Sequence, residues 1–318
     1  MEFFYVALGL VILLLAGDSL VRGAVNASLR LGVPALIVGL TIVAFGTSAP
    51  ELLVSIRAIQ DDAPGIALGN VVGSNIANIL LVLGIPALIS GIRTGDSETR
   101  KSYVTMIAAS VLFIALAFLG PLTWMHGLVL LAALTVILWD QLREALAHRR
   151  NGLAAADDDE EEVEGADPSM PWWKIGLFTL LGLVGLPLGA DLLVENSVLI
   201  ARGFGVSETV IGLTLVAIGT SLPELATTVM AAIRREADVA LGNVIGSNMF
   251  NLLAIMGLAS FFGTIDVDRQ FLTFDFWVML GASLILAPFV FSRTLDMTKR
   301  WGILFVALYG AYLYALVA

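Results

Sequence analysis

The sequence predicts an all-α membrane protein in which ten transmembrane helices form two inverted five-helix repeats, with helices broken near the midplane. Three observations predict this fold class: an apolar composition, ten apolar runs of helix length, and an internal duplication of polar motifs. Hydrophobic residues make up 58% of the 318 residues, charged residues make up 14%, and the mean hydropathy is +0.92. These values lie far from those of soluble domains. At about 20 residues a span, the chain has room for roughly ten spans and for no large soluble domain.

The apolar runs follow one another in the same order along both halves of the chain. In the first half, the expected spans lie near residues 3–28, 34–58, 65–90, 102–119 and 122–143. The first run has no basic segment before it and no small-residue cleavage pattern after it, so we expect it to be retained as a span. In the second half, the spans lie near residues 172–201, 207–233, 238–262, 270–292 and 300–317.

The only credible linker is an acidic polar segment between the halves. The formal net charge of the chain is −10, and eight acidic residues lie in this one segment: Asp157, Asp158, Asp159, Glu160, Glu161, Glu162, Glu164 and Asp167. We interpret the segment as a solvated tether, with a regulatory cation-binding strip as the alternative. The expected domains are a first five-helix repeat at 1–143, an acidic linker at 144–171 and a second, inverted five-helix repeat at 172–318.

The two halves contain a duplicated segment. Residues 39–84 align without a gap with residues 212–257, at an offset of 173, and 23 of the 46 positions are identical. About three identities would be expected by chance from average composition. The identities concentrate on Gly, Thr, Ser, Pro, Glu and Asn, so shared apolar composition does not explain them.

Five spans in each half predict that the two copies cross the membrane in opposite directions. The positions of basic residues test this independently. With the N-terminus outside, 14 of the 17 Lys and Arg residues face the cytoplasm, and only Arg57, Arg202 and Arg269 face out. Both termini are then expected outside a cell (inner) membrane that the chain crosses many times, and the acidic linker is expected in the cytoplasm.

Each copy carries two polar interruptions inside apolar spans. They run from Gly46 to Glu51 and from Gly69 to Asn78 in the first copy, and at the equivalent positions in the second. As local structure, Ser48-x-x-Glu51 and Ser221-x-x-Glu224 are expected to form capping boxes that restart a helix after a proline. Capping does not explain why two helices break at membrane depth, where free backbone groups need protein or a cavity around them. We therefore expect a cation site at the breaks, with purely structural breaks as the alternative.

The available ligand atoms are all oxygen, because the chain has no Cys and only two isolated His residues, His126 and His148. This excludes thiolate and His metal sites, and it favours Ca²⁺, Na⁺ or similar hard ions over soft transition metals. Two carboxylates carry −2, which one Ca²⁺ neutralises and which several Na⁺ ions could share. Besides freed carbonyls, the candidate ligands are Glu51, Glu224, the hydroxyls of Thr47, Ser48, Ser74, Thr220, Ser221 and Ser247, and the amides of Asn78 and Asn251.

The motif GTSxPE followed by GNxxGSNxxN, present twice and inverted, resembles the alpha-repeats of the cation/Ca²⁺ exchanger superfamily, in its short prokaryotic Na⁺/Ca²⁺ exchanger branch. The resemblance implies a ten-helix antiporter whose first and sixth spans slide across a rigid core. It implies a Ca²⁺ site made by Glu51, Glu224 and the carbonyls of Thr47 and Thr220. It also implies Na⁺ sites that draw on Ser48, Ser74, Ser221, Ser247 and the carbonyls of Ala44 and Ala217.

Related exchangers often carry an acidic residue at the position of Asn251, which Asn78 mirrors in the first repeat. With an amide at this position, the site has a charge of −2 instead of −3, and proton coupling there has no titrating group. The Na⁺ stoichiometry and K⁺ involvement stay open. Asp18 and Asp191 would lie on the sliding helices, where they either act in gating or are polar residues near an interface.

The expected function is secondary active Na⁺/Ca²⁺ antiport by alternating access. A Ca²⁺/H⁺ or K⁺-dependent exchanger of the same fold is the first alternative, and a cation channel is a more distant one. The sequence lacks a nucleophile-base set for an intramembrane enzyme and a Walker-type loop for ATP, so we expect no enzyme activity, no cofactor and no nucleotide or nucleic-acid partner. The expected partners are inorganic cations, with transported Ca²⁺ and Na⁺, and the lipid bilayer. The oligomeric state is not predicted.

Overall fold

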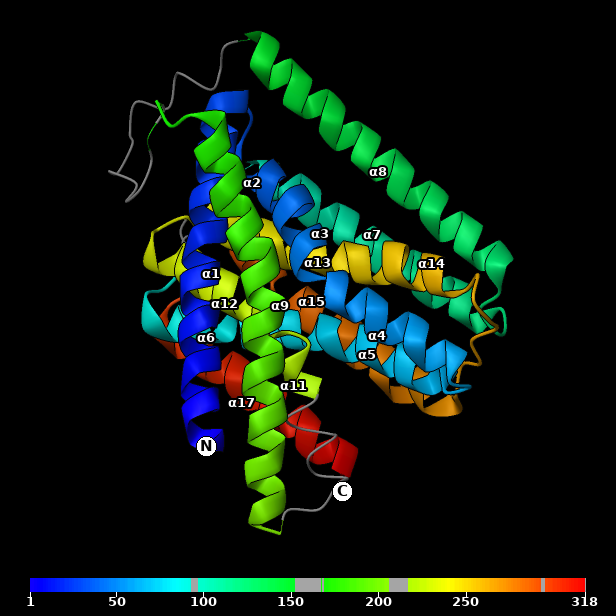
Figure 1. Ribbon diagram of the computed structural model, residues 1–318. Coiled ribbons are helices and arrows are strands. Elements are labelled where there is room, and N and C mark those ends of the chain that lie inside the picture. The colour runs from blue at the N-terminus through cyan, green and yellow to red at the C-terminus, as the bar shows by residue number, and fades with distance from the viewer. Residues whose placement is uncertain (93–96, 152–166, 168, 206–216, 293–294, 318) are drawn as a thin grey trace.

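The computed structural model describes residues 1–92, 97–151, 167, 169–205, 217–292 and 295–317, and these residues are almost entirely helical (Figure 1). Seven helices in the described ranges are long and apolar enough to cross a membrane, and a pair of helices bent by 42° at Ser48 makes a further span. A shorter apolar helix and the C-terminal helix complete the expected order. The expected span at 207–233 and the linker at 144–171 fall partly outside the described residues.

The first half holds five spans, of which the second and third are interrupted. These spans are α1 (Glu2–Leu31); α2 (Ala35–Val38), η1 (Gly39–Val43), α3 (Ala44–Thr47) and α4 (Ala49–Gln60); α5 (Pro64–Ala77), η2 (Asn78–Val82) and α6 (Gly84–Ile89); α7 (Ser97–Phe118); and α8 (Trp124–Asn151). The segments η1 and η2 are π-helical turns, in which each backbone bond spans one residue more than in an α-helix. The break at Ser48 lies in the first polar motif and η2 begins at Asn78, the last residue of the second, whereas η1 precedes the first motif.

The second half repeats this order. Its elements are α9 (Trp172–Gly203); α11 (Ala217–Gly219) and α12 (Leu222–Ile233); α13 (Ala237–Phe250), η5 (Asn251–Ile255) and α14 (Met256–Ala259); η6 (Phe271–Asp275), α15 (Phe276–Ile285) and α16 (Ala287–Phe291); and α17 (Lys299–Val317). The bounds of α12, α13 and η5 each lie 173 residues after those of α4, α5 and η2. Asp62 and Arg235, at the same offset, both have a positive φ of about 60° in the turn that follows. The duplication in sequence is therefore a duplication in backbone structure.

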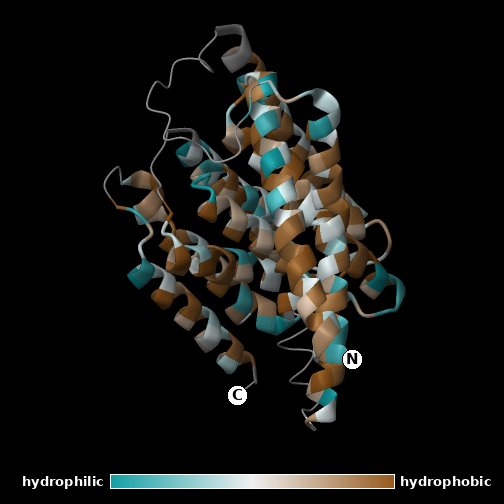
Figure 2. Cartoon of the chain, turned by 60° about the vertical axis from the view of Figure 1, so that its left-hand side comes forward, coloured by the Kyte–Doolittle hydropathy of each residue, from teal (hydrophilic) through white to brown (hydrophobic). Residues whose placement is uncertain are grey.

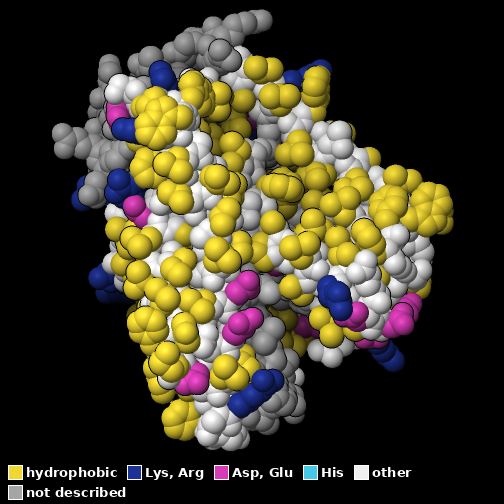
Figure 3. All heavy atoms as spheres, viewed as in Figure 1, with side chains coloured by type: hydrophobic (Ala, Val, Ile, Leu, Met, Phe, Trp, Pro, Cys, Tyr) yellow, Lys and Arg dark blue, Asp and Glu magenta, His cyan; other side chains and the backbone are white. Residues whose placement is uncertain are grey.

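Helices α5 and α13 lie at the centre of the molecule. Burial inside the protein reaches 78% of the α5–α6 span and 100% of the α13–α14 span, against 22% of α8 and of α9. The surrounding helices carry mostly hydrophobic residues (Figure 2), and hydrophobic side chains dominate the surface seen in Figure 3. A protein in a bilayer is expected to have a hydrophobic surface and to bury the helices that carry polar motifs, here α5 and α13, inside it.

Helices α1 and α9 run side by side across the front of the molecule in Figure 1. Their backbones approach closely where both carry glycine. A Cβ added to Gly9 would lie 2.7 Å from the Leu193 nitrogen, and a Cβ added to Gly189 would lie 2.9 Å from the Leu13 nitrogen. Small residues that permit such an approach are typical of packed membrane helices. The pair thus forms one tightly packed unit.

Candidate cation site

The helix breaks occur at equivalent residues of the two repeats. Ser48 and Ser221 leave the helical conformation, with φ, ψ of −85°, 3° and −91°, 7°, and α4 and α12 restart with a proline in their first turn. Proline suits this position because its missing N–H is not needed there. The restart places Glu51 and Glu224 in the first turn of each new helix.

The predicted capping boxes do not form. Neither Ser48 nor Ser221 makes a side-chain hydrogen bond to the start of its own helix. The Ser48 hydroxyl instead donates to Oε1 of Glu224, at 3.2 Å, in the other repeat. The prediction was wrong because neither hydroxyl is turned towards its own helix: the Ser48 hydroxyl is oriented towards a buried carboxylate of the other repeat, and the Ser221 hydroxyl has no partner among the described residues.

Both carboxylates are fully buried, each with 0% of its surface exposed. Oε1 and Oε2 of Glu51 and Oε2 of Glu224 have no hydrogen-bond partner in the described part of the chain. The two side chains lie within electrostatic range of each other, and no ion pair of either glutamate with a basic residue occurs among the described residues. Buried carboxylates without partners are costly at membrane depth. Their arrangement suits a cation that supplies the missing charge.

Other unpartnered buried atoms belong to the same predicted ligand set. They are Oγ of Ser74, Oγ of Ser221, Oδ1 of Asn78, and both Oδ1 and Nδ2 of Asn251. Buried polar groups in native proteins nearly always have partners. Most of the exceptions among the described residues lie in the duplicated motifs, the others being atoms of Arg22, Gln141 and Glu236. This concentration indicates oxygen atoms kept available for an ion.

Three of the remaining predicted ligands, Thr47, Ser247 and Ala44, already have partners. The Thr47 hydroxyl lies 3.2 Å from Oδ1 of Asn243 and 3.5 Å from Oγ of Ser247, which joins the two repeats. The Ala44 carbonyl accepts the Ser48 N–H at 3.0 Å and the Thr47 hydroxyl at 3.3 Å. Thr220 lies half-buried in the turn after α11, and Ala217 begins that helix.

The sequence analysis missed two pairs of asparagines that hold the site together. Nδ2 of Asn70 donates to the Glu51 carbonyl at 3.3 Å and to Oγ of Ser55 at 3.2 Å. In the second repeat, Nδ2 of Asn243 donates to the Glu224 carbonyl at 3.3 Å and to Oγ1 of Thr228 at 3.0 Å. Each asparagine therefore ties a restarted helix to α5 or α13. The available signal was their identity in both repeats inside the polar motifs.

The second missed pair lies where α5 and α13 meet. Nδ2 of Asn75 donates to the Asn248 carbonyl at 3.2 Å, and Nδ2 of Asn248 donates to the Asn75 carbonyl at 3.3 Å. Oδ1 of Asn248 also accepts from Nδ2 of Asn78 at 3.0 Å. This reciprocal pair fixes the two central helices against each other beside the candidate ligands.

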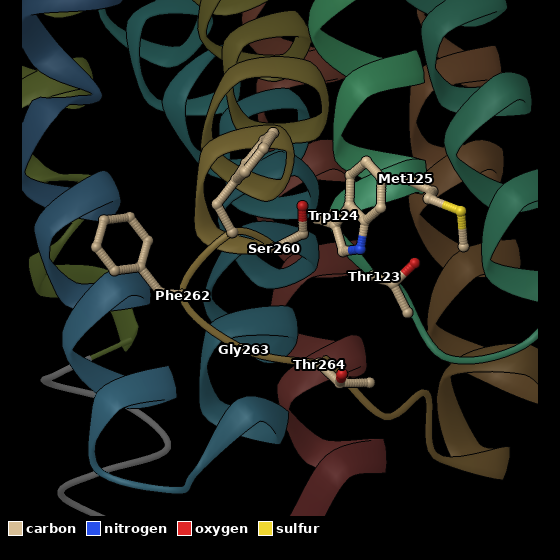
Figure 4. A pocket seen from close by; sticks show the side chains of 8 residues that line it. Thr123, Trp124, Met125, Ser260, Phe262, Gly263 and Thr264 are labelled. Carbon is tan, nitrogen blue, oxygen red and sulfur yellow. The ribbon is translucent and has the colours of Figure 1, made fainter.

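Two cavities of the described structure lie away from the predicted ligands. A cavity of about 490 Å³ is lined by Thr123, Trp124 and Met125 at the start of α8 and by the loop from Ser260 to Thr264 (Figure 4). A second, of about 350 Å³, lies among α15, α17 and η2 and includes Phe274 and Tyr312. Neither contains a predicted ligand. The candidate site is therefore defined by its buried, unpartnered oxygen atoms, and it lies apart from these two cavities.

Comparison with known proteins places the chain in a family. Residues 1–142 and 174–318 match the model of the sodium/calcium exchanger protein family. The sodium/calcium exchanger MaX1 of Methanosarcina acetivorans is 36% identical, with 99% of this chain and 98% of that protein covered. The inner membrane protein YrbG of Escherichia coli is 32% identical, with 93% and 90% covered.

Among solved structures, the sodium-calcium exchanger NCX_Mj soaked with 2.5 mM Na⁺ and 0.1 mM Ca²⁺ superposes with a TM-score of 0.82 at 32% identity. The match covers 99% of this chain and 98% of that one. The likeness confirms the predicted fold class of ten helices in two inverted five-helix repeats. A matched family model over both halves, close relatives of full length and a shared fold together show that this multi-pass membrane protein belongs to the sodium/calcium exchanger protein family.

Proposed function

We propose that the chain is an antiporter that exchanges Na⁺ for Ca²⁺ across the cell membrane. The observation that carries this proposal is the pair of fully buried glutamates, Glu51 and Glu224. Three of their four carboxylate oxygens have no hydrogen-bond partner among the described residues, and neutral oxygen ligands lie in the same motifs. Hard cations prefer such ligands. The names of the relatives, sodium/calcium exchangers, point to the same pair of ions.

In this proposal, Ca²⁺ is bound by Glu51 and Glu224 with the carbonyls of Thr47 and Thr220. Sodium ions share the same carboxylates and draw on the surrounding oxygens of Ser48, Ser74, Ser221, Ser247, Asn78 and Asn251 and on the carbonyls of Ala44 and Ala217. One Ca²⁺ or several Na⁺ ions balance the charge of the two carboxylates. Binding of either ion species therefore excludes the other, which is the physical basis of exchange.

Alternating access follows from how the helices are packed. We propose that α1 and α9 move together, because glycine contacts join them to each other, while α5 and α13 stay fixed through the Asn75–Asn248 pair. Movement of an outer pair across a buried core opens the midplane site to the two sides in turn. We keep the domain division of the sequence analysis as part of the proposal: repeats at 1–143 and 172–318 joined by a linker at 144–171, into whose first residues α8 continues as far as Asn151.

The proposed orientation has both termini outside and the linker in the cytoplasm. Its support is the distribution of Lys and Arg, of which 14 of 17 lie on the linker side. The resident membrane would be the cell (inner) membrane. No enzymatic step and no resident cofactor is part of the proposal, because the cations are cargo.

The test is Ca²⁺ uptake into proteoliposomes loaded with Na⁺ and diluted into Na⁺-free buffer, beside vesicles that carry only a pH gradient. We expect uptake that requires internal Na⁺ and is lost in Glu51→Gln and in Glu224→Gln. The matched control is Glu144→Gln, whose carboxylate pairs with Lys101 at 2.8 Å away from the site. Uptake driven by the pH gradient alone would establish Ca²⁺/H⁺ exchange instead. Undiminished uptake in either folded glutamine variant would overturn the ligand assignment.

A further inference from the structure

The carboxylate of Asp18 joins α1 to the end of α12. Nε of Arg234 donates to Oδ1 of Asp18 at 2.6 Å, and Nη2 of the same guanidinium also contacts this oxygen. Nε of Arg22, one turn along α1, lies 3.0 Å from Oδ2. Arg234 is only 8% exposed and Asp18 is 21% exposed. The contact is therefore better shielded than an ordinary surface ion pair.

The repeat predicts an equivalent contact at the other end of the molecule, and the structure does not have it. At an offset of 173, Asp191 corresponds to Asp18 and Asp61 corresponds to Arg234. These counterparts are both acidic. Asp61 pairs with Arg57 of its own helix at 2.9 Å, whereas Asp191 is exposed and takes part in no ion pair of the described residues. Among the described residues, this interhelical ion pair is therefore present at one of the two equivalent ends and has no counterpart at the other.

Helix packing is asymmetric in the same sense. Helix α1 packs along α12, and a Cβ added to Gly17 would lie 3.0 Å from the Ala226 carbonyl oxygen and 3.3 Å from Cγ of Met230. Helix α9 does not pack along α4 to a comparable extent, although both helices are fully described. At the Arg234 end, α1 is therefore closed against α12. At the Asp61 end, α9 is not closed against α4 in the same way.

From these contacts we propose that the Asp18–Arg234 ion pair is a one-sided latch that holds the exchanger closed at the Arg234 end. The inference rests on the proposed alternating access. In the opposite state the repeats exchange roles, so α1 leaves α12 and α9 approaches α4. That movement separates Asp18 from Arg234 and brings Asp191 towards the like charge of Asp61. Both changes disfavour the state that is open at the Arg234 end.

The absence of cysteine from the chain makes this population measurable. Ala226→Cys places a single thiol on α12 where α1 covers it, since Ala226 is 7% exposed. In purified, ion-free protein in detergent, the rate at which a water-soluble maleimide labels this thiol reports the fraction of molecules in which α1 has left α12. We expect Asp18→Asn to raise the labelling rate about tenfold, which corresponds to about 1.4 kcal/mol.

A second variant acts on the opposite state. Asp191→Arg replaces a like charge by an attractive one opposite Asp61, so it should also raise the labelling rate while Asp18 and Arg234 are intact. The control is Asp140→Asn. It removes an exposed acidic charge on α8 that pairs with Lys101 of α7, and it should leave the labelling rate unchanged.

The outcomes separate the latch from the function on which it rests. An unchanged labelling rate of the thiol in folded Asp18→Asn would overturn the latch. If Asp18→Asn does not fold, an unchanged labelling rate in Asp191→Arg would overturn it. Absence of Na⁺-driven Ca²⁺ uptake by the unmodified chain would overturn the proposed function instead. If both proposals are correct, Asp18→Asn still exchanges ions. The Ca²⁺ concentration that gives half-maximal exchange then decreases on the side of the membrane that contains the Arg234 end.

Discussion

Removal of the Ser48 hydroxyl should affect the ion-free protein differently from removal of its counterpart Ser221. In Ser48→Ala the hydrogen bond to Glu224, at 3.2 Å, is lost, whereas the Ser221 hydroxyl has no partner to lose. A hydrogen bond contributes about 0.5–1.5 kcal/mol with a neutral partner and about 1.5–3 kcal/mol with a charged one. The distance is long for a charge-assisted bond, so we take about 1.5 kcal/mol for Ser48→Ala and approximately zero for Ser221→Ala.

Equilibrium unfolding in mixed micelles, without Na⁺ or Ca²⁺, measures the free energy of unfolding of each variant. Saturating Ca²⁺ should then bring the two variants closer together, because Glu224 turns to the ion and gives up its hydrogen bond with Ser48. Equal losses of stability in ion-free buffer would refute the asymmetric hydrogen bond. A gap that persists unchanged in Ca²⁺ would refute the role of Glu224 as the shared ligand.

Three further changes test other parts of the structure. Asn251→Asp adds a titrating carboxylate where the amide has no partner, so Ca²⁺ affinity should rise on the order of tenfold between pH 6 and pH 8 in a binding titration, while the affinity of the unmodified chain changes less. Burial, with a smaller contribution from Asp238 and against the effect of Arg234, raises the pKa of Glu236, outside the spans, to about 7 from 4.5. The folded state therefore binds this proton more tightly than the unfolded state, and stability should fall by up to roughly 3 kcal/mol as pH rises from 4.5 to 7 and then level off. Glu236→Gln should lack this fall in thermal unfolding, and the same change of stability with pH in the variant and the unmodified chain would contradict the prediction. Gly189→Ala should lower the free energy of unfolding by about 1–3 kcal/mol and slow exchange, because its Cβ meets the Leu13 nitrogen. The control is Gly176→Ala on the same helix, where a Cβ meets nothing within 4 Å. It should change neither the stability nor the rate of exchange in the same unfolding and uptake assays.

Much of the fold could be predicted because the information that determines it is local and repeated. Apolar runs of span length mark the helices, and the shared offset of 173 places α4 with α12 and α5 with α13. The π-helical turns at Asn78–Val82 and Asn251–Ile255 were not predicted. One additional residue in a single turn shifts the apolar periodicity too little to be read in a fully buried helix.

The ligand set could be proposed from residue type, but its internal bonding could not. Ser48 was expected to cap its own helix, and it reaches Glu224 instead. Asn75 and Asn248 were seen as part of a motif, and their reciprocal bonds appear only when two segments distant in sequence cross. Propensity describes a residue's neighbours along the chain, whereas these partners are set by the packing of one repeat on the other.

The bonds between Asn75 and Asn248 have a consequence for how the molecule could arise and assemble. Each repeat supplies the amide donor that the other repeat's carbonyl accepts, and both carbonyls are buried at the centre of the protein. A single repeat on its own would keep its carbonyl bonded to a backbone N–H of the same helix, but it would leave the side-chain amide donor in hydrocarbon without this acceptor, at a cost of several kcal/mol. A second copy in the opposite orientation satisfies the donors of both copies at once. The fused chain therefore retains the logic of an antiparallel homodimer: neither half is a folding unit, and two separately expressed halves should recover the structure only by finding each other in the membrane.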